Sequence, residues 1–337
     1  MKVDSYFPPA PPRGAADAAR QAAECRFDGF FTAETAHDPF IPLAFAAQAA
    51  PALDLGTAIA VAFPRSPMVV AQTAWDLASL SDGKFILGLG TQVKAHITRR
   101  FSVEWTSAGS RLRDYILALR AIWHSFQTGA KLAYESESYS FSLLTPFFRP
   151  EPMDHWDIPV AIAGVGPHLS KLAGEVCEGF HVHPFHTVKY LDEVVLPNIA
   201  VGAAAAGRTL EDVERMSTVF VVTGRDDAEI ARATTAVKQQ VAFYASTPSY
   251  SIVLETEGWD FGPQLSAMSR RGEWAEMASV IPDEVIDAVA VVGAPDEIGA
   301  KIKARYGHRV QRIGYYALDG APMPEGEELA AMVAATK

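Results

Sequence analysis

The stretch FILGLGTQVKAH, residues 85–96, combines two features that a plain strand and turn do not need. Its apolar run contains Gly88 and Gly90, and the polar segment after it contains Thr91, Gln92 and His96. Glycines let another group approach a strand end closely, and the polar side chains offer that group hydrogen bonds. We therefore predict a ligand-binding strand end here. A simple turn is the alternative explanation for the two glycines.

The stretch AGVGPHLSKLAG, residues 163–174, suggests a site for a phosphate group. A strand ends in the small-residue turn Gly164-Val165-Gly166, and Pro167 stands where the first turn of a helix would begin. Such a turn presents free backbone N–H groups and the positive end of the helix dipole. An ordinary tight turn between a strand and a helix would explain the sequence equally well.

Three side chains near strand ends could act as a general acid or base. Glu34 and His37 follow the run FDGFF, and His183 follows GFHV. We rank them in the order Glu34, His37, His183. His181 and His183 alternate, which suits two ligands of a metal, but the sequence marks no third ligand and we predict no metal site. Cys25 and Cys177 are too few for a thiolate metal site or a disulfide framework.

The elements that position these residues alternate between short apolar runs and amphipathic helical stretches, which is typical of a parallel α/β sheet. Eight runs read as strands, and each but the last is followed by a helix. The eight runs are 2–7, 27–34, 53–63, 84–90, 158–164, 179–185, 217–224 and 312–320. Eight units in 337 residues predict a single (β/α)8 TIM barrel. The alternative, an open doubly wound sheet, typically has a Gly-x-Gly-x-x-Gly turn after its first strand. This chain has prolines at that place, which argues against the open sheet.

Two stretches exceed the bare repeat, and we interpret them as insertions after strands four and seven of one domain, residues 1–337. Residues 129–157 look like a hairpin with a proline-marked return, and residues 246–282 are aromatic and helical. Trp259, Phe261 and Trp274 in the second insertion favour an apolar small-molecule substrate, although a core or interface role is equally compatible.

The composition narrows the class of partner. The formal net charge is −11, which argues against a nucleic-acid-binding surface because the phosphate backbone would be repelled. No apolar stretch approaches the length of a membrane span, and the first residues lack a signal-peptide core; we expect a cytoplasmic protein without membrane contact. The alanine-rich helical stretches 42–50 and 69–80 have small side chains that permit close helix packing, so we expect a homodimer.

Three blocks of sequence together resemble the bacterial-luciferase-like superfamily. They are GFFTAETAHDPF (29–40), the segment from Leu53 to His96, and AIAGVGPHLSKLAGEVCEGFHVHPF (161–185). Within that superfamily they are most similar to the oxidoreductases that use the deazaflavin coenzyme F420, and the likeness runs from Met1 to about Asp319. It implies a barrel with the ring of the cofactor lying across the strand ends.

The resemblance also assigns residues to the cofactor. A cis peptide bond between Ala58 and Ile59, in a bulge of strand three, would support one face of the ring. Thr91 matches a position that contacts the cofactor, and His96 matches one that bonds its side chain. The turn Gly164-Val165-Gly166 matches the one that holds the phosphate.

The chain departs from its deazaflavin relatives where acid–base chemistry is concerned. Many of them have an Asp-His pair after strand two, where this sequence has Glu34 and Thr35, with His37 two residues further on. Val93 stands where some have a catalytic carboxylate. Only the placement of the cofactor is therefore carried over from the resemblance.

These observations lead to one prediction and two alternatives. The prediction is an F420-dependent oxidoreductase that transfers a hydride between the deazaflavin and an organic substrate. One alternative is an FMN-dependent luciferase-like monooxygenase that uses reduced flavin and dioxygen. The other is a non-catalytic barrel that binds the cofactor or serves as a subunit.

Overall fold

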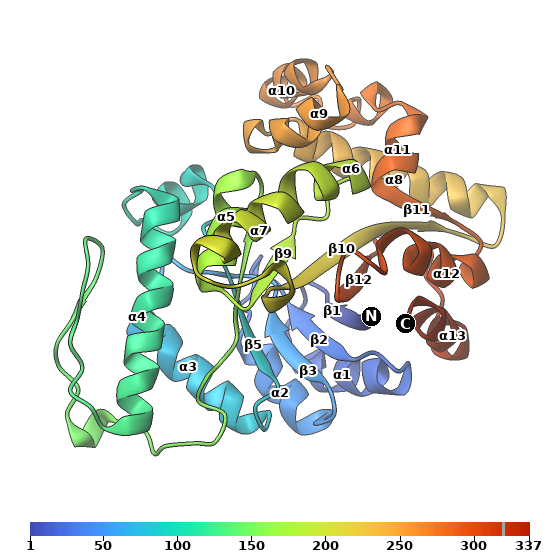
Figure 1. The fold of residues 1–337 in the computed structure, drawn as a ribbon. Coiled ribbons are helices and arrows are strands. Elements are labelled where there is room, and N and C mark those ends of the chain that lie inside the picture. Colours follow the sequence, from blue (N-terminus) through green and yellow to red (C-terminus); the bar gives the residue numbers. More distant parts are fainter. Residues whose placement is uncertain (319–320) are drawn as a thin grey trace.

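Parallel strands form a closed barrel in the order β1–β2–β3–β5–β8–β9–β10–β12, with β12 pairing back to β1 (Figure 1). The structure is a computed structural model and describes residues 1–318 and 321–337. The barrel strands are β1 (Lys2–Phe7), β2 (Gly29–Thr32), β3 (Asp54–Thr57), β5 (Phe85–Gly90), β8 (Val160–Gly164), β9 (Gly179–Val182), β10 (Glu214–Thr223) and β12 (Arg312–Tyr316). This is the (β/α)8 barrel that the alternating pattern predicts.

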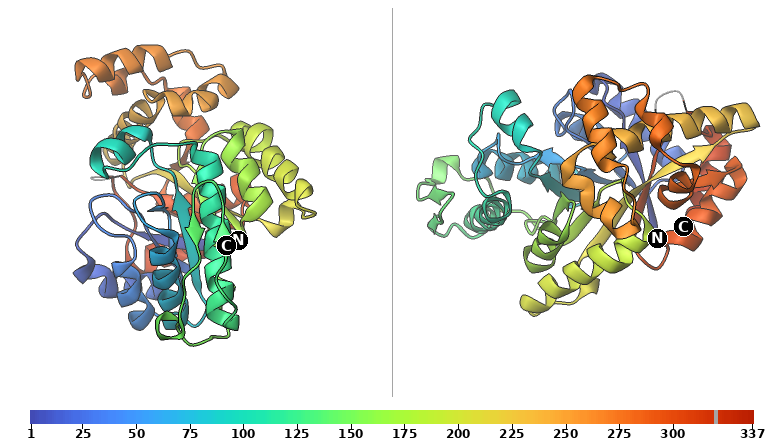
Figure 2. Two further views of the ribbon diagram at one scale, coloured as in Figure 1. Left: turned by 90° about the vertical axis from the view of Figure 1, so that its left-hand side faces the viewer. Right: turned by 90° about the horizontal axis from the view of Figure 1, so that it is seen from above.

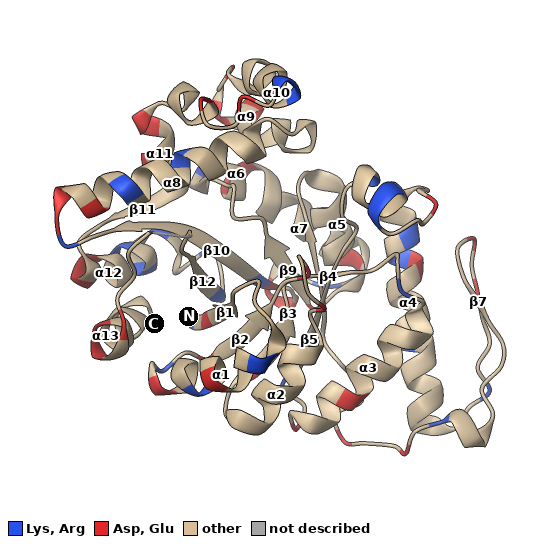
Figure 3. Cartoon of the chain, turned by 180° about the vertical axis from the view of Figure 1, so that it is seen from behind, with Lys and Arg blue, Asp and Glu red and all other residues tan. Residues whose placement is uncertain are grey.

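Helices connect the strands and cover the outside of the barrel. They are α1 (Ala15–Glu24), α2 (Ile41–Ala49), α3 (Pro67–Leu80), α4 (Ala108–Thr128), α5 (Pro167–Val176), α6 (Val188–Tyr190), α7 (Leu196–Ala205), α8 (Asp227–Ala245), α12 (Pro295–Tyr306) and α13 (Gly326–Thr336). Charged residues lie mainly on these outer helices and their loops (Figure 3). No helix among the described residues has the length and apolar character needed to cross a membrane.

Each of the eight predicted runs overlaps one strand of the barrel, and seven contain theirs in full; β10 begins at Glu214, before the predicted run 217–224. Asp319 and Gly320, at the end of the last run, lie outside the described residues. The expectation that no helix follows the last strand is wrong, because α13 packs against α12 and brings the carboxyl terminus beside the amino terminus. The chain ends are further tied by an ion pair between Lys337 and Asp28.

The segment 129–157 contains an antiparallel hairpin of β6 (Tyr134–Glu135) and β7 (Ser140–Phe141), which lies between α4 and β8 in the chain. It extends along α4 on the outside of the barrel (Figures 1 and 3). Leu143, Phe147 and Phe148 near its end are strongly exposed. The strand-like and proline-rich sequence of this segment accounts for the hairpin and its return.

The aromatic segment 246–282 folds into helices α9 (Ser251–Glu257) and α10 (Gly262–Arg271), followed by α11 (Asp283–Val289). These helices lie beyond one end of the barrel (Figures 1 and 2). The chain then returns through a short strand, β11 (Ala290–Gly293), which pairs with the far end of β10. Because β10 is ten residues long, it pairs with β9 at its start and still has room for β11 at its end.

The amino-terminal end of the barrel interior is closed by a buried ion network. Arg312 donates two hydrogen bonds to Asp4, at 2.8 and 2.6 Å, and one to Asp54 at 2.6 Å. The Arg312 guanidinium also lies over the ring of Phe31, 5.3 Å from its centroid. Gly29 makes room for this network, since a Cβ there would lie 2.4 Å from Asp4 Oδ1.

Candidate active site

Strand three is interrupted by a bulge at the carboxyl end of the barrel. β3 ends at Thr57, the peptide bond between Ala58 and Ile59 is cis, and pairing with β5 resumes in β4 (Ala60–Val61). The cis bond is where the resemblance implies it. The Thr57 hydroxyl donates to the carbonyl of Gly88 at 2.6 Å and accepts the N–H of the same residue at 2.9 Å.

The two glycines of FILGLG are required by this bulge. A Cβ on Gly88 would lie 1.8 Å from the carbonyl oxygen of Thr57 and 2.8 Å from Nε2 of His181. A Cβ on Gly90 would lie 2.6 Å from the side chain of Ile59. Both glycines therefore permit the bulge to pack against β5, whatever else binds above them.

Glu34 ties the loop after β2 (Gly29–Thr32) to the bulge. Its carboxylate accepts the N–H of Val61 and a guanidinium N–H of Arg65, both at 2.7 Å, and only 6% of its side chain is exposed. Its own backbone N–H donates to the carbonyl of Ile59 at 3.0 Å. Arg65 also binds Asp38, at 3.0 Å. Glu34 has the contacts of a residue that holds the bulge, and its predicted acid–base role stays a prediction.

The polar segment after β5 lies at the surface of the same end of the barrel. Thr91 and Gln92 are partly buried, and His96 is exposed at the start of a short helix. Gln92 has a positive φ of 55° and accepts the N–H of Val93 at 2.9 Å. Among the described residues, neither the Thr91 hydroxyl nor the His96 ring has a hydrogen-bond partner, so both keep their capacity for a ligand.

The turn after β8 (Val160–Gly164) forms a cradle at the amino terminus of α5. Gly166 has φ +90°, and a Cβ on it would meet nothing within 4 Å. Gly164 is different, because a Cβ there would lie 2.4 Å from Leu169 of the helix. The Gly166 N–H donates to the hydroxyl of Tyr190 at 3.0 Å, and that hydroxyl has no acceptor for its own proton among the described residues. Val165 lies between the two glycines and is partly buried.

His183 lies just beyond the end of β9 and belongs to a cluster with three tyrosines. Its Nε2 is 3.1 Å from the hydroxyl of Tyr250, and the hydroxyls of Tyr244 and Tyr316 are 3.2 Å apart. The His183 ring lies 4.6 Å from the ring of Tyr244 and 4.5 Å from that of Tyr250. We call these four residues the tyrosine cluster. Sequence reasoning found His183 and missed the three tyrosines.

Burial keeps the histidines of the stretch HVHPFH uncharged. It lowers the pKa of His181 to about 4, that of His183 to about 3 and that of His186 to about 4. His181 is buried, and its Nε2 has no hydrogen-bond partner among the described residues. No group of three or more His, Cys, Asp or Glu side chains in the described ranges is placed to hold a metal ion.

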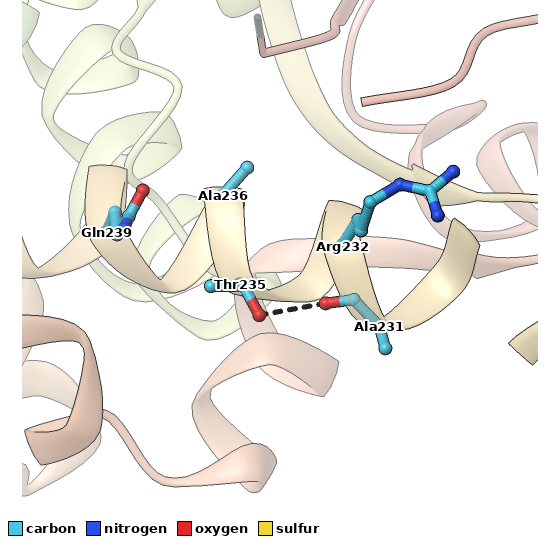
Figure 4. A pocket seen from close by; sticks show the side chains of 5 residues that line it. All are labelled: Ala231, Arg232, Thr235, Ala236 and Gln239. Carbon is cyan, nitrogen blue, oxygen red and sulfur yellow. Dashed lines mark hydrogen bonds between the residues drawn. The ribbon is translucent and has the colours of Figure 1, made fainter. Parts of the chain in front are cut away.

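The surface has hollows that these residues do not line. One is shallow and lies along α8, lined by Ala231, Arg232, Thr235, Ala236 and Gln239 (Figure 4). Its lining residues come from one helix, and within it Figure 4 marks only the bond from the Thr235 hydroxyl to the Ala231 carbonyl. It contains none of the residues that the sequence marks for chemistry.

The carboxyl ends of β2, β3 and β5 thus meet around the bulge. The contacts that join them are made by Glu34, Ile59 and Gly90. His183 instead joins the tyrosine cluster. His37 is exposed in the loop after β2 and has no side-chain hydrogen bond among the described residues.

A comparison with protein-family models shows which family the chain belongs to. The model of the luciferase-like monooxygenases matches residues 3–312. The chain belongs to the luciferase-like monooxygenase family. An uncharacterised member from Mycobacterium tuberculosis is 46% identical over 314 residues, which cover 93% of this chain and 92% of that protein.

Solved structures of the luciferase-like fold include enzymes with two kinds of cofactor. The coenzyme F420-dependent tetrahydromethanopterin reductase of Methanopyrus kandleri has a TM-score of 0.78 and 20% identity, covering 99% of this chain and 96% of that one. The oxygenating constituent of 3,6-diketocamphane monooxygenase of Pseudomonas putida, in complex with FMN, has a TM-score of 0.72 and 15% identity, covering 99% and 96%. At these identities the likeness shows the fold alone.

Proposed function

We propose that this protein is an oxidoreductase that binds coenzyme F420 and transfers a hydride between it and an organic substrate. The observation that carries the proposal is the cradle at Gly166, where the backbone turns through a conformation that favours glycine and leaves open space above it. A turn of this kind before a helix suits a phosphate. The F420-dependent reductase among the structures of the same fold supports the choice of cofactor.

The residues present fit such a group. Gly164, Val165 and Gly166 would hold the phosphate, with the free hydroxyl proton of Tyr190 as a further donor. Thr91, Gln92 and His96 would bind the polar parts of the cofactor, and Ala58, Ile59 and Gly90 would form the apolar support under its ring. When bound, the deazaflavin would supply hydride chemistry, while the chain positions the substrate and handles the proton.

Copurified cofactor tests the proposal most directly. Absorption spectra of the purified protein, followed by titration with F420 and with FMN, distinguish the deazaflavin from the flavin. We expect F420 to bind at least tenfold more tightly than FMN, a difference of about 1.4 kcal/mol. Tighter binding of FMN would favour the monooxygenase alternative, for which the FMN complex of the same fold offers support. Binding of F420 without turnover with any reductant would favour the non-catalytic barrel.

The cradle can be tested by one substitution and a matched control. Gly166→Asp should weaken F420 binding more than tenfold, because the carboxylate would fill the open space and repel the phosphate. Gly207→Asp is the control, since Gly207 also has a positive φ, of 71°, and open space around it but lies after α7 in the chain. If both variants bind F420 within threefold of the parent protein, the cradle is not the phosphate site.

We also propose a homodimer through α2 and α3. Ile41, Phe45 and Val69 are 51%, 47% and 52% exposed and lie on two helices that pack against each other; exposed large apolar side chains on adjoining helices suit a subunit interface. Light scattering at micromolar concentration should give twice the mass of the chain. Phe45→Lys should shift the mass toward the monomer, while Val201→Lys, at an exposed apolar position on α7, should not. A monomeric parent protein would refute the proposal.

A further inference from the structure

The hydrogen bonds of His183 determine which of its nitrogens carries the proton. The N–H of Phe185 donates to Nδ1 of His183 at 3.1 Å, so Nδ1 presents a lone pair. The ring is uncharged, since burial lowers its pKa to about 3, and its single proton therefore sits on Nε2. Nε2 then donates to the Tyr250 hydroxyl at 3.1 Å. The oxygen of Tyr250 accepts, which leaves its own proton free to be donated to something else.

That proton has no acceptor among the residues that the structure describes. The hydroxyls of Tyr244 and Tyr316 bond to each other, and one such bond uses only one of their two protons. The tyrosine cluster therefore keeps hydroxyl protons that no described residue accepts. All four of its residues are partly exposed, so an added oxygen atom can reach the spare protons.

The surroundings of the cluster select an uncharged ligand. Phe185 packs against Tyr244 and Tyr250, with ring centroids 6.3 Å apart in each case, and Phe220 stacks on Tyr316 at 5.1 Å. Within the described residues, no charged side chain takes part in the hydrogen bonds or ring contacts of the cluster. A carboxylate or phosphate would lose its hydration here without gaining a cation. An apolar molecule with a single carbonyl or hydroxyl oxygen fits this chemistry.

We infer that Tyr250, held by His183, is the proton donor to the carbonyl oxygen of a neutral ketone or aldehyde, an inference that rests on the proposed hydride-transfer function. The carbonyl carbon accepts a hydride from the reduced deazaflavin, and the π electron pair of the C=O bond moves to the oxygen. That oxygen takes the Tyr250 proton, and the O–H bond of the tyrosine breaks. The carbonyl is reduced to an alcohol and the deazaflavin is oxidised. The Tyr250 phenolate, still accepting from Nε2 of His183, regains a proton from water.

The protonation states agree with this direction of transfer. Burial raises the pKa of Tyr250 to about 12, so the phenol is protonated at neutral pH and acts as a donor. His183 stays neutral and acts as a positioning residue, because it fixes the tyrosine hydroxyl without exchanging a proton. Tyr250 belongs to the insertion after α8, so the segment that extends the barrel also supplies the group that touches the substrate.

A chromophoric aldehyde gives a readout that needs no turnover. The absorption band of 4-(dimethylamino)benzaldehyde moves to longer wavelength when its carbonyl oxygen accepts a hydrogen bond, because the excited state carries more charge on that oxygen. We expect the shift with the parent protein loaded with oxidised F420, and its loss in Tyr250→Phe. Tyr315→Phe is the matched control, since Tyr315 is the neighbour of Tyr316 but bonds to Thr336 of α13; it should keep the shift.

Turnover and rescue complete the test. With reduced F420, Tyr250→Phe should lower the rate of aldehyde reduction by about 10²–10⁴-fold, with F420 affinity within twofold of the parent protein. His183→Leu should lower the rate as well, and His183→Gln, which keeps an N–H, should restore part of it. The inference is overturned if the parent protein binds F420 but shows no shift with the aldehyde, or if Tyr250→Phe retains full activity. Failure to bind F420 or FMN would instead remove the proposed function.

Discussion

The two ends of the barrel interior treat polar groups in opposite ways. At the amino-terminal end, Arg312, Asp4 and Asp54 are buried or half-buried, and their charges are paired within hydrogen-bond distance. At the carboxyl end, Tyr250 and Thr91 keep hydrogen-bonding capacity that no described residue uses. Polar groups whose hydrogen bonds are all made stabilise one arrangement of the chain. Polar groups without a partner are costly unless a ligand or a water molecule hydrogen-bonds to them. The first end serves stability and the second is available for binding.

Acid should act on the carboxyl end first, and this is the largest effect that we expect. His181, His183 and His186 have folded-state pKa values of about 4, 3 and 4, below the ordinary 6.5. Between pH 6.5 and about 4 the unfolded chain binds more protons, so stability falls as the pH falls. From pH 7 to pH 5 each histidine should cost about 2 kcal/mol, or about 6 kcal/mol for all three. Urea unfolding at the two pH values measures this loss.

A histidine variant links the loss to these side chains. His186→Gln should reduce the difference between pH 7 and pH 5 by about 2 kcal/mol, since one titrating group is gone. The amino-terminal end should offset a small part of this loss, because burial raises the pKa of Asp4 from its ordinary 3.8 to about 6. Between pH 7 and pH 5 the folded state takes up a proton there, and stability rises by about 1 kcal/mol. Asp54 should not contribute in this window. Although burial acts to raise it, hydrogen bonds from Lys2 and Arg312 lower the pKa of Asp54 below its ordinary 3.8, so its contribution is present above about pH 4 and is lost only in stronger acid. A flat stability profile from pH 7 to pH 5 would contradict the assignment.

Breaking the ion network at the other end should give the next largest effect. Arg312→Leu leaves the Asp4 carboxylate buried without its partner and should cost about 3–5 kcal/mol in the free energy of unfolding. Lys301→Leu removes the exposed pair of Lys301 with Glu297 and should cost less than about 1 kcal/mol. Urea unfolding at pH 7.5 compares the two. Similar costs for both variants would show that the buried ion network at the amino-terminal end of the barrel stabilises the fold no more than an exposed ion pair does.

The close approach of β5 to the bulge predicts a smaller effect. Gly88→Ala places a Cβ 1.8 Å from the carbonyl oxygen of Thr57, and the backbone must move to accept it, at a cost of about 1–3 kcal/mol. Gly109→Ala is the control, because a Cβ on Gly109 meets nothing within 4 Å and Ala favours the helix α4. Thermal unfolding should show a lower midpoint for the first variant and an equal or higher one for the second. An unchanged midpoint for Gly88→Ala would show that the bulge is adaptable.

The smallest effect on stability is expected where polar groups have no partner. Thr91→Val should change the free energy of unfolding by less than about 0.5 kcal/mol, because the hydroxyl bonds to no described residue. It should nevertheless weaken F420 binding by about tenfold, or about 1.4 kcal/mol. Isothermal titration and thermal unfolding of the same variant separate the two quantities. A loss of stability without a loss of affinity would make Thr91 part of the fold and not of the site.

The barrel could be read from the sequence because each strand is a short apolar run with a local signal. β11 was missed since its four residues extend β10 above the barrel, outside the eightfold repeat. The helix α13 was missed because the repeat is complete without it. The cis bond between Ala58 and Ile59 was predicted from the family resemblance, because the stretch LGTAIAV contains no physical signal for it.

The site was less accessible to sequence reasoning. Glu34 looked like a free carboxylate because its partner Arg65 is 31 residues away. The tyrosine cluster draws its members from the loop after β9, from α8, from the inserted segment and from β12, and no local motif connects them. The glycine turn at Gly166 was visible, whereas the contribution of Tyr190 to it depends on a contact across 24 residues.

The long strand β10 has a consequence for how such a barrel can diversify. The inserted segment leaves the barrel after α8 and is returned to it by β11, which docks on an edge of β10 that the eight-stranded frame does not use. The points at which the segment leaves the barrel, after α8, and rejoins it, at β11, are thus fixed by the barrel itself. The residues between these two points are free to vary in length and sequence. Replacing residues 246–289 with the corresponding segment of a relative would exchange Tyr250 and its neighbours as one module. Evolution could in this way alter substrate preference without redesigning the barrel.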